Sequence, residues 1–496
     1  MKVILKKIGK LEIIIFVSGS VVMVLELIGS RIVAPYLGTS IFVWASLIGI
    51  ILGALSLGYY LGGRFSKTNP NLQFLGRTLL LAGLSILLIT LIQKPVLTLA
   101  MQLGVKTGSV VATLGLFTIP SIIMGIVSPY AIRLKTDTVE HAGGVAGNLY
   151  ALSTIGSIAG TFLAGFYLIP TFGSQQILFG LSITLILVSL LANKNIFSFL
   201  ILLLAFNLLG FSSLTDSKFV YESESAYNHI IVKDGVDKSG RQVRALYLAT
   251  ELHSIIYKDS TELASKYHQN YALDTLFKPD IATALSLGGG AYVAPQDFLR
   301  RFPDAKMTVV EIDPEVTAVA RDFFGLKSNP RLTIRHEDGR IFLNNNQEKF
   351  DVIYGDAFAS YYSIPFQLTT AEAVKKMHDA LTDDGILILN VISGLDGDRA
   401  KFLNAEYLTI KQYFPQIYLF PVDFRDEANF DKIQNIVLIA TKNSNRLSKE
   451  EMLNLANANQ VPYVNNLWEQ QPNIKPTDRI LTDDFAPVDY YISKFL

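Results

Sequence analysis

The stretch that decides the fold is "SLGGGAYVAPQDF", residues 286–298. Gly288, Gly289 and Gly290 follow an apolar run and precede a helical segment that we expect to begin near Pro295. Glycines let a backbone turn sharply and come close to a ligand at the carboxyl edge of a sheet. The G-x-G-x-x-G pattern of dinucleotide sites is missing, so the turn predicts a site for a single nucleoside.

Apolar strands alternate with helical segments around this turn, as "IATALSL", "KMTVVEI", "RLTIRHE", "FDVIYGD" and "GILILNVI". This alternation predicts a Rossmann-like, doubly wound α/β domain with a mainly parallel sheet, over residues 276–496. The preceding residues carry short β-rich runs, "HIIV", "RALYLAT" and "HSIIY", separated by turns. They predict a small antiparallel sheet over residues 215–275.

Acidic residues follow three of the predicted strands. Glu311 ends the second strand, where an acid can accept hydrogen bonds from both ribose hydroxyls. Asp338 and Gly339 follow the third strand, where a carboxylate can accept from an adenine amino group, and Asp356 follows the fourth. Because the carboxyl ends of parallel strands share one edge, these residues predict one nucleoside site.

The N-terminal part has the composition of a membrane domain. Charged residues are scarce over residues 11–214, and seven apolar stretches are long enough to cross a bilayer, at 11–34, 41–62, 76–94, 108–132, 146–170, 174–193 and 196–213. We expect residues 1–214 to form a multi-pass helical bundle whose first span is retained. Glycines four residues apart predict close helix packing, at Gly49/Gly53, Gly58/Gly62 and Gly156/Gly160.

The loop charges give an orientation. Lysine and arginine gather before the first span and in alternate loops, at Lys2, Lys6, Lys7, Lys10, Arg64, Lys67, Arg77, Arg133, Lys135 and Lys194. The positive-inside rule then predicts a cytoplasmic N-terminus. Seven spans would place the soluble part outside the cytoplasm, although a nucleoside substrate is expected near its cytoplasmic supply. An error of one span reverses this placement.

Several classes of function receive no support from the composition. The 43 basic residues balance the 43 acidic ones and no basic tract stands out, so a nucleic-acid partner is not expected. No zinc-type spacing, Ser-His-Asp arrangement or phosphate loop is visible, and the absence of cysteine rules out thiolate chemistry. We therefore expect no metal. A homo-oligomer is compatible with the sequence.

Together these motifs resemble the polyamine aminopropyltransferases, or spermidine synthases, and in particular their membrane-fused, multi-pass branch. The soluble part carries the resemblance in "SLGGG", "VVEIDPEV", "EDGRIFL" and "YGDAF…SIPFQLTTAEAV". The membrane part carries it in "VLELIGSRIVAPYLG" and "GNLYALSTIGSIAGTF", and the C-terminal end in "LTDDFAPVDYY". Nearly the whole chain is covered.

The resemblance implies roles for individual residues. Asn228 would touch the thioadenosine, Pro365 would pack on the base, and Asp356 would accept the proton of the amine. The pair Tyr267 and His268 would lie beside the amine site. The sequence departs from the family where an acid after the glycine triple is replaced by Ala291, and where a second acid near the base is replaced by Ala359.

The function implied is aminopropyl transfer from decarboxylated S-adenosylmethionine to a small amine, putrescine or a related polyamine, with a spermidine-like product and methylthioadenosine. Two alternatives stay open. One is an S-adenosylmethionine-dependent methyltransferase, which shares the fold. The other is a non-catalytic module that binds or transports a polyamine or nucleoside, an idea favoured by the two missing acids and by Glu26 inside the first span.

Overall fold

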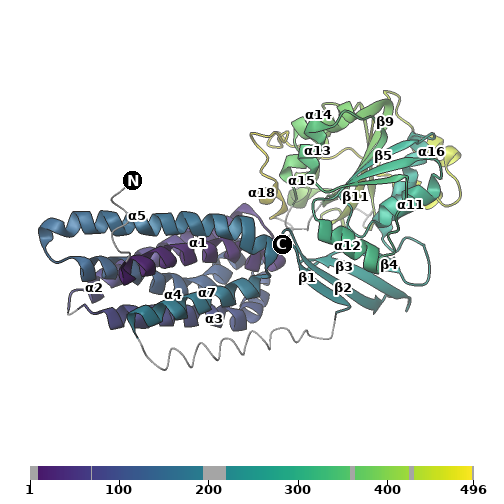
Figure 1. The fold of residues 1–496 in the computed structure, drawn as a ribbon. Coiled ribbons are helices and arrows are strands. Elements are labelled where there is room, and N and C mark those ends of the chain that lie inside the picture. The colour runs from purple at the N-terminus through teal and green to yellow at the C-terminus, as the bar shows by residue number, and fades with distance from the viewer. Residues whose placement is uncertain (1–8, 69, 194–218, 358–363, 424–428, 494–496) are drawn as a thin grey trace. The chain divides into compact units, whose positions relative to one another are not determined.

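The computed structural model describes residues 9–68, 70–193, 219–357, 364–423 and 429–493. The chain divides into two compact units, one made mainly of residues 1–217 and the other mainly of residues 227–496 (Figure 1). Each unit is described by itself below. The three-part division expected from the sequence stays a prediction.

The first unit is helical. Its long helices are α1 (Lys10–Leu37), α2 (Ile41–Phe65), α3 (Leu72–Met101), α4 (Gly104–Lys135), α5 (Val139–Leu163) and α7 (Ser174–Ala192), with a π-helical turn η1 (Ala164–Leu168) and α6 (Ile169–Thr171) continuing α5. Among the described residues, six helical segments are long and apolar enough to cross a membrane. They confirm six of the expected spans. The seventh, 196–213, lies outside the described residues, so the side of the membrane on which the soluble part lies stays a prediction.

The glycine pairs behave in two ways. A Cβ atom at Gly58 would collide with the carbonyl oxygen of Ile122 in α4, and one at Gly156 with that of Phe16 in α1. Close packing of α2 on α4 and of α5 on α1 is therefore confirmed at these positions. The expectation is wrong for Gly49 and Gly53, where a Cβ atom would meet nothing within 4 Å. Spacing alone cannot tell a packed helix face from an open one.

The second unit begins with a four-stranded sheet in the order β1-β2-β3-β4. Its strands are β1 (Tyr221–Glu224), β2 (His229–Val236), β3 (Gln242–Leu248) and β4 (Glu251–Tyr257), and β2, β3 and β4 pair antiparallel. The predicted small sheet is confirmed, and β4 is one of its edges. We refer to it as the small sheet.

The larger sheet has seven strands in the order β10-β11-β9-β8-β5-β6-β7. Five strands run parallel, β5 (Thr283–Leu287), β6 (Lys306–Val310), β7 (Leu332–Arg335), β8 (Phe350–Gly355) and β9 (Leu381–Ser393). β11 (Gln434–Thr441) is antiparallel to both of its neighbours, β9 and β10 (Gln416–Pro421). The doubly wound fold is confirmed, and the strand order reverses beside β5, where such folds bind ligands.

Helices cover both faces of this sheet (Figure 1). They are α9 (Lys266–Asn270), α10 (Asp274–Phe277), α11 (Val293–Arg301), α12 (Pro314–Phe323), α13 (Gly339–Asn345), α14 (Ala371–Ala380), α15 (Lys401–Ile410), α16 (Lys449–Leu455), α17 (Val461–Val464) and α18 (Val488–Ile492), with short turns η2 (Tyr271–Leu273), η3 (Phe366–Leu368) and η4 (Gly397–Ala400).

Two apolar clusters hold the layers together, because side chains alternate across a strand. On β5, Leu285 and Leu287 pack into the cluster that includes α14 and α15, whereas Ala284 packs into the cluster that includes α11. The sheet is thus buried on both sides, and its carboxyl edge is left to form a site.

Candidate active site

The glycine turn joins two strand ends. Gly288 has φ +97° and Gly290 has φ +50°, values that favour glycine. A Cβ atom at Gly288 would also collide with the carbonyl oxygen of Asp356. The turn therefore lies directly against the end of β8. Helix α11 follows it from Val293, slightly earlier than expected.

A cavity of about 410 Å³ opens at this edge, between the carboxyl ends of the large sheet and the small sheet. All the site residues named from the sequence line it: Asn228, Tyr267, His268, Gly288, Gly289, Gly290, Glu311, Asp338, Gly339, Asp356 and Pro365. The structure thus brings together residues that are far apart in the chain. Their individual roles stay predictions.

Glu311 holds the glycine turn in place. Its Oε2 accepts the backbone N–H groups of Gly289 at 2.9 Å and Gly290 at 3.2 Å, and its Oε1 accepts that of Asp313 at 3.0 Å. Burial raises the pKa of the Glu311 carboxyl, and these N–H donors offset the rise only in part. The carboxylate that is expected to bind the ribose is therefore also part of the turn.

Two other predicted residues have structural partners as well. Asp338 caps α13, because its Oδ1 accepts the N–H groups of Arg340 at 2.8 Å and Ile341 at 3.0 Å. Asn228 donates from Nδ2 to Asp313 Oδ2 at 3.0 Å. These bonds fix both side chains at the cavity before any ligand binds.

Asp356 is held by three side chains, whereas the donors to Glu311 are backbone N–H groups. Its Oδ2 lies 3.2 Å from the Tyr267 hydroxyl and 3.3 Å from His268 Nε2, and its Oδ1 accepts from Asn390 Nδ2 at 3.1 Å. Burial raises its pKa, but the hydrogen bonds from His268, Asn390 and Tyr267, together with the charge of His268, outweigh burial and leave the pKa below its ordinary value. Asp356 is therefore ionised at neutral pH.

Two amides that were not predicted from the sequence orient Asp356. Asn390 on β9 donates to Asp356, and Asn435 on β11 donates from Nδ2 to Asn390 Oδ1 at 2.9 Å. Both line the cavity. The available signal was a lone asparagine within each of two apolar strands, "ILILNVI" and "QNIVLIA".

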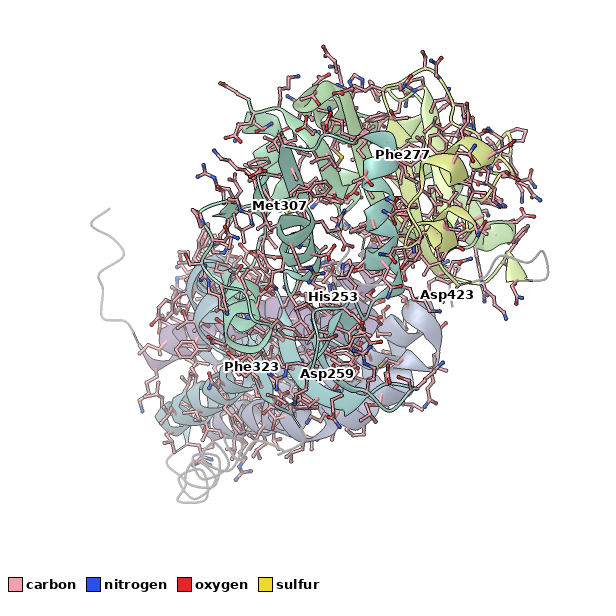
Figure 2. The ribbon with its side chains drawn as sticks, turned by 90° about the vertical axis from the view of Figure 1, so that its right-hand side faces the viewer. His253, Asp259, Phe277, Met307, Phe323 and Asp423 are labelled. Carbon is pink, nitrogen blue, oxygen red and sulfur yellow. The ribbon has the colours of Figure 1, made fainter. Side chains whose placement is uncertain are left out.

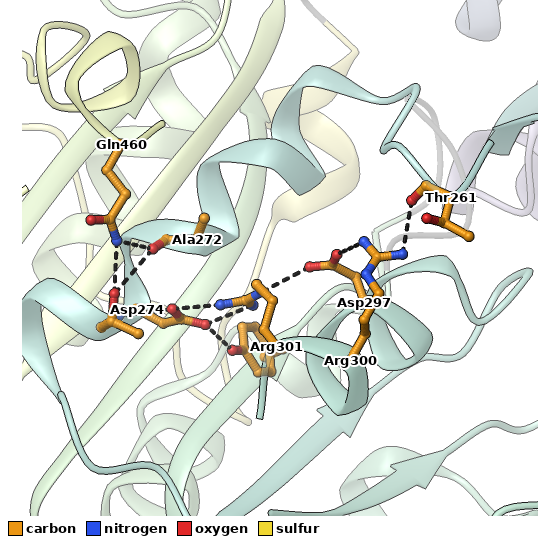
Figure 3. Close-up of polar contacts among 9 residues, drawn as sticks. Thr261, Ala272, Asp274, Asp297, Arg300, Arg301 and Gln460 are labelled. Carbon is orange, nitrogen blue, oxygen red and sulfur yellow. Dashed lines mark hydrogen bonds and ion pairs between the residues drawn. The ribbon is translucent and has the colours of Figure 1, made fainter. Parts of the chain in front are cut away.

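A buried ion network surrounds Asp274 and Arg301 (Figure 3). Asp274 is fully buried and accepts both guanidinium arms of Arg301 at 2.9 Å and the hydroxyl of Tyr354 at 2.6 Å. The ring of Tyr271 packs between two other rings. Its centroid lies 5.3 Å from that of Tyr354 and 5.6 Å from that of His268. The network therefore fixes the aromatic layer on which His268 lies.

The missing acid after the glycine triple leaves no gap in the cavity wall. Ala291 is fully buried in an apolar cluster with Ile230, Leu246 and Val316, and its N–H donates to Ser254 Oγ at 3.1 Å. It does not line the cavity. Ala359 lies outside the described residues.

The charge of the cavity is one-sided. Five carboxylates line it, from Glu251, Glu311, Glu337, Asp338 and Asp356, and no lysine or arginine is among the described lining residues. Apart from tyrosines, the other ionisable side chains among the described lining residues are His253 and His268. Figure 2 labels His253. A low-dielectric cleft lined by one sign of charge concentrates ligands of the other sign. The cavity therefore suits a cation.

The chain is similar to known proteins of one family. Residues 270–422 match the family described as the spermine/spermidine synthase domain. The chain is 27% identical over 182 residues to a probable polyamine aminopropyl transferase of Bifidobacterium longum, which covers 37% of this chain and 39% of that protein. It is 25% identical over 297 residues to a polyamine aminopropyltransferase of Vibrio vulnificus, with 56% and 92% covered. It is 23% identical over 403 residues to polyamine aminopropyltransferase 2 of Aquifex aeolicus, with 76% and 78% covered.

Proposed function

We propose that this chain belongs to the spermine and spermidine synthase family. On this premise, it transfers an aminopropyl group from decarboxylated S-adenosylmethionine to a small amine such as putrescine. Methylthioadenosine and a spermidine-like amine would be the products. The membrane unit would hold this transferase at a lipid bilayer.

The charge of the cavity is the observation that carries the proposal. Decarboxylated S-adenosylmethionine has a sulfonium and a primary ammonium group, and the acceptor is also an amine, so both substrates are cations. Five carboxylates and no described lysine or arginine line the cavity. Intact S-adenosylmethionine carries a carboxylate in addition, and no lysine or arginine among the described lining residues could pair with it. The charge therefore favours aminopropyl transfer over methyl transfer.

The nucleoside would lie along the ends of β5, β6 and β7. Glu311 would accept the ribose hydroxyls, Asp338 would accept the adenine amino group, and Gly288 would leave room for the sulfonium end. Pro365 and Asn228 would contact the base and the thioadenosine. Each of these residues lines the cavity.

The transfer step needs a neutral amine, and because an alkylamine has a pKa of about 10 and is mostly protonated at neutral pH, the acceptor must first release one proton to water. The nitrogen lone pair forms a bond to the methylene carbon next to sulfur, the C–S bond breaks, and its electron pair leaves on sulfur as a neutral thioether. The nitrogen then carries the positive charge and releases a proton.

Asp356 would serve this step by its charge. Because hydrogen bonds keep the pKa of Asp356 low, its carboxylate accepts a hydrogen bond from the attacking nitrogen, stabilises the growing positive charge and passes the proton on to water. Tyr267 and His268 fix the oxygen that faces the amine.

The experiment that tests the proposal separates three functions by their products. Detergent-purified protein is incubated with putrescine and either decarboxylated or intact S-adenosylmethionine. We expect methylthioadenosine from the decarboxylated compound only. S-adenosylhomocysteine would instead identify a methyltransferase. Bound nucleoside without either product would identify a non-catalytic binding module, and both results would overturn the proposal.

A further inference from the structure

Strand β4 forms the wall of the cavity that the sequence did not indicate. Residues 251–255 of β4 all line the cavity, and they include Glu251, His253 and Ser254. In a regular strand, Glu251 and Ser254 would face opposite sides. The pairing places them on the same side, because Leu246 pairs with Ser254 while Tyr247 pairs with Leu252, which leaves one extra residue in β4. Such a bulge re-aims side chains and is common next to active sites.

Glu251 differs from the carboxylates on the opposite wall. Glu311, Asp338 and Asp356 each accept several hydrogen bonds from the protein. Over the described residues, no hydrogen bond or ion pair reaches the Glu251 carboxylate. Glu337 has no such partner either, but it adjoins Asp338 at the nucleoside side.

Glu251 also carries an energetic cost. The side chain is half-buried, and burial alone raises the pKa of its carboxyl. A buried carboxylate without a partner is unfavourable, and a cationic ligand removes that cost by pairing with it. The cavity offers no lysine or arginine of its own, among the residues described, to take that place.

We propose that Glu251 binds a primary ammonium group at the end of a ligand alkyl chain, on the small-sheet wall of the cavity. This rests on the proposed function and identifies a residue that selects for a second positive charge. Ala291 cannot do so, because it lies in an apolar cluster away from the cavity. The ammonium belongs either to the far end of the amine acceptor or to the aminopropyl end of the sulfonium substrate.

Calorimetry on the full-length protein in detergent distinguishes these sources with two ligand pairs. Putrescine and butylamine differ by the distal ammonium, and decarboxylated S-adenosylmethionine and its S-propyl analogue, which keeps the sulfonium, differ by the terminal ammonium of the aminopropyl group. We compare the wild type, Glu251→Gln, Glu251→Asp and, as a control, Glu262→Gln, which alters an exposed glutamate paired with Arg241. Thermal unfolding checks that each variant is folded.

We expect Glu251→Gln to lower the affinity for the doubly charged ligand of one pair by about tenfold or more, because a charge-assisted hydrogen bond is lost. The affinity for the other ligand of that pair should not change. Loss in the amine pair assigns Glu251 to the acceptor, and loss in the nucleoside pair assigns it to the aminopropyl end. Glu251→Asp should lose less, because it keeps the charge, and Glu262→Gln should lose nothing.

Equal affinities of the wild type and Glu251→Gln for all four ligands would overturn the inference, as would equal losses within both pairs. These readouts measure binding and need no turnover. A wild-type protein that binds the ligands but yields no methylthioadenosine would overturn the proposed function, and the two ligand pairs would still decide the role of Glu251.

Discussion

The cavity has two walls that are built in different ways. The wall from the large sheet consists of strand ends, and its acids Glu311, Asp338 and Asp356 are held by donors of the protein itself. The wall from the small sheet is the side of an edge strand with a bulge, and Glu251 there has no such donor over the described residues. A wall with satisfied acids positions the reacting groups, whereas a wall with an unsatisfied acid depends on its ligand.

The largest effect should come from Asp356 on the first wall. Asp356→Asn keeps the shape but removes the charge that stabilises the attacking nitrogen, so turnover should fall by about 10²–10⁴-fold while affinity for methylthioadenosine changes little. Product assays and calorimetry measure the two quantities. Turnover similar to that of the wild type would remove Asp356 from the chemistry.

A second test concerns the boundary between the walls. Ala291→Asp would place an unpaired charge among Ile230, Leu246 and Val316, so we expect it to destabilise the protein by about 3–5 kcal/mol and to add no activity toward diamines. Thermal unfolding in detergent measures the loss, with the matched substitution Ala458→Asp at an exposed position as control. A stable variant that gains diamine activity would show that position 291 faces the ligand.

The third test uses pH on Glu311. Burial raises the pKa of the Glu311 carboxyl. As the pH is lowered, Glu311 therefore becomes protonated at a higher pH than an ordinary glutamate, and the ionised form that would bind ribose is lost. Affinity for methylthioadenosine should therefore fall as the pH is lowered from 7.5 to 5. Asp356, whose pKa is lowered, stays ionised throughout this range.

Glu311→Gln provides the control for that profile. It should weaken methylthioadenosine binding about 10–100-fold at neutral pH and flatten the pH dependence, because the titrating group is gone. A variant that keeps the slope of the wild type would assign the titration to another group.

The smallest effect should come from the amide pair behind Asp356. Asn435→Ala removes one hydrogen bond to Asn390 and leaves Asp356 with its three direct partners, so we expect kcat to fall about 3–10-fold, with KM for the amine nearly unchanged. Asn435→Leu, which has a similar volume and cannot donate, should resemble it. A change in KM alone would make Asn435 a binding residue.

The large-sheet wall was predictable because its signals are local. An apolar strand followed by glycine or an acid specifies a strand end, and parallel strands bring such ends to one edge whatever the loops between them do. Gly288, Glu311, Asp338 and Asp356 were identified in this way. The six described membrane helices were predictable for a similar reason, since length and apolar composition suffice.

Which surface each of these residues contacts was decided only by tertiary packing. Gly58 packs against α4 while Gly49 on the same helix meets nothing, although both belong to the same spacing pattern. Ala291 follows the glycine turn and yet lies in an apolar cluster. Glu251 lines the cavity through a bulge that depends on the register of β3 and β4. Sequence period determines which residues can share a face, but contact with a partner surface depends on side-chain packing between segments far apart in the chain.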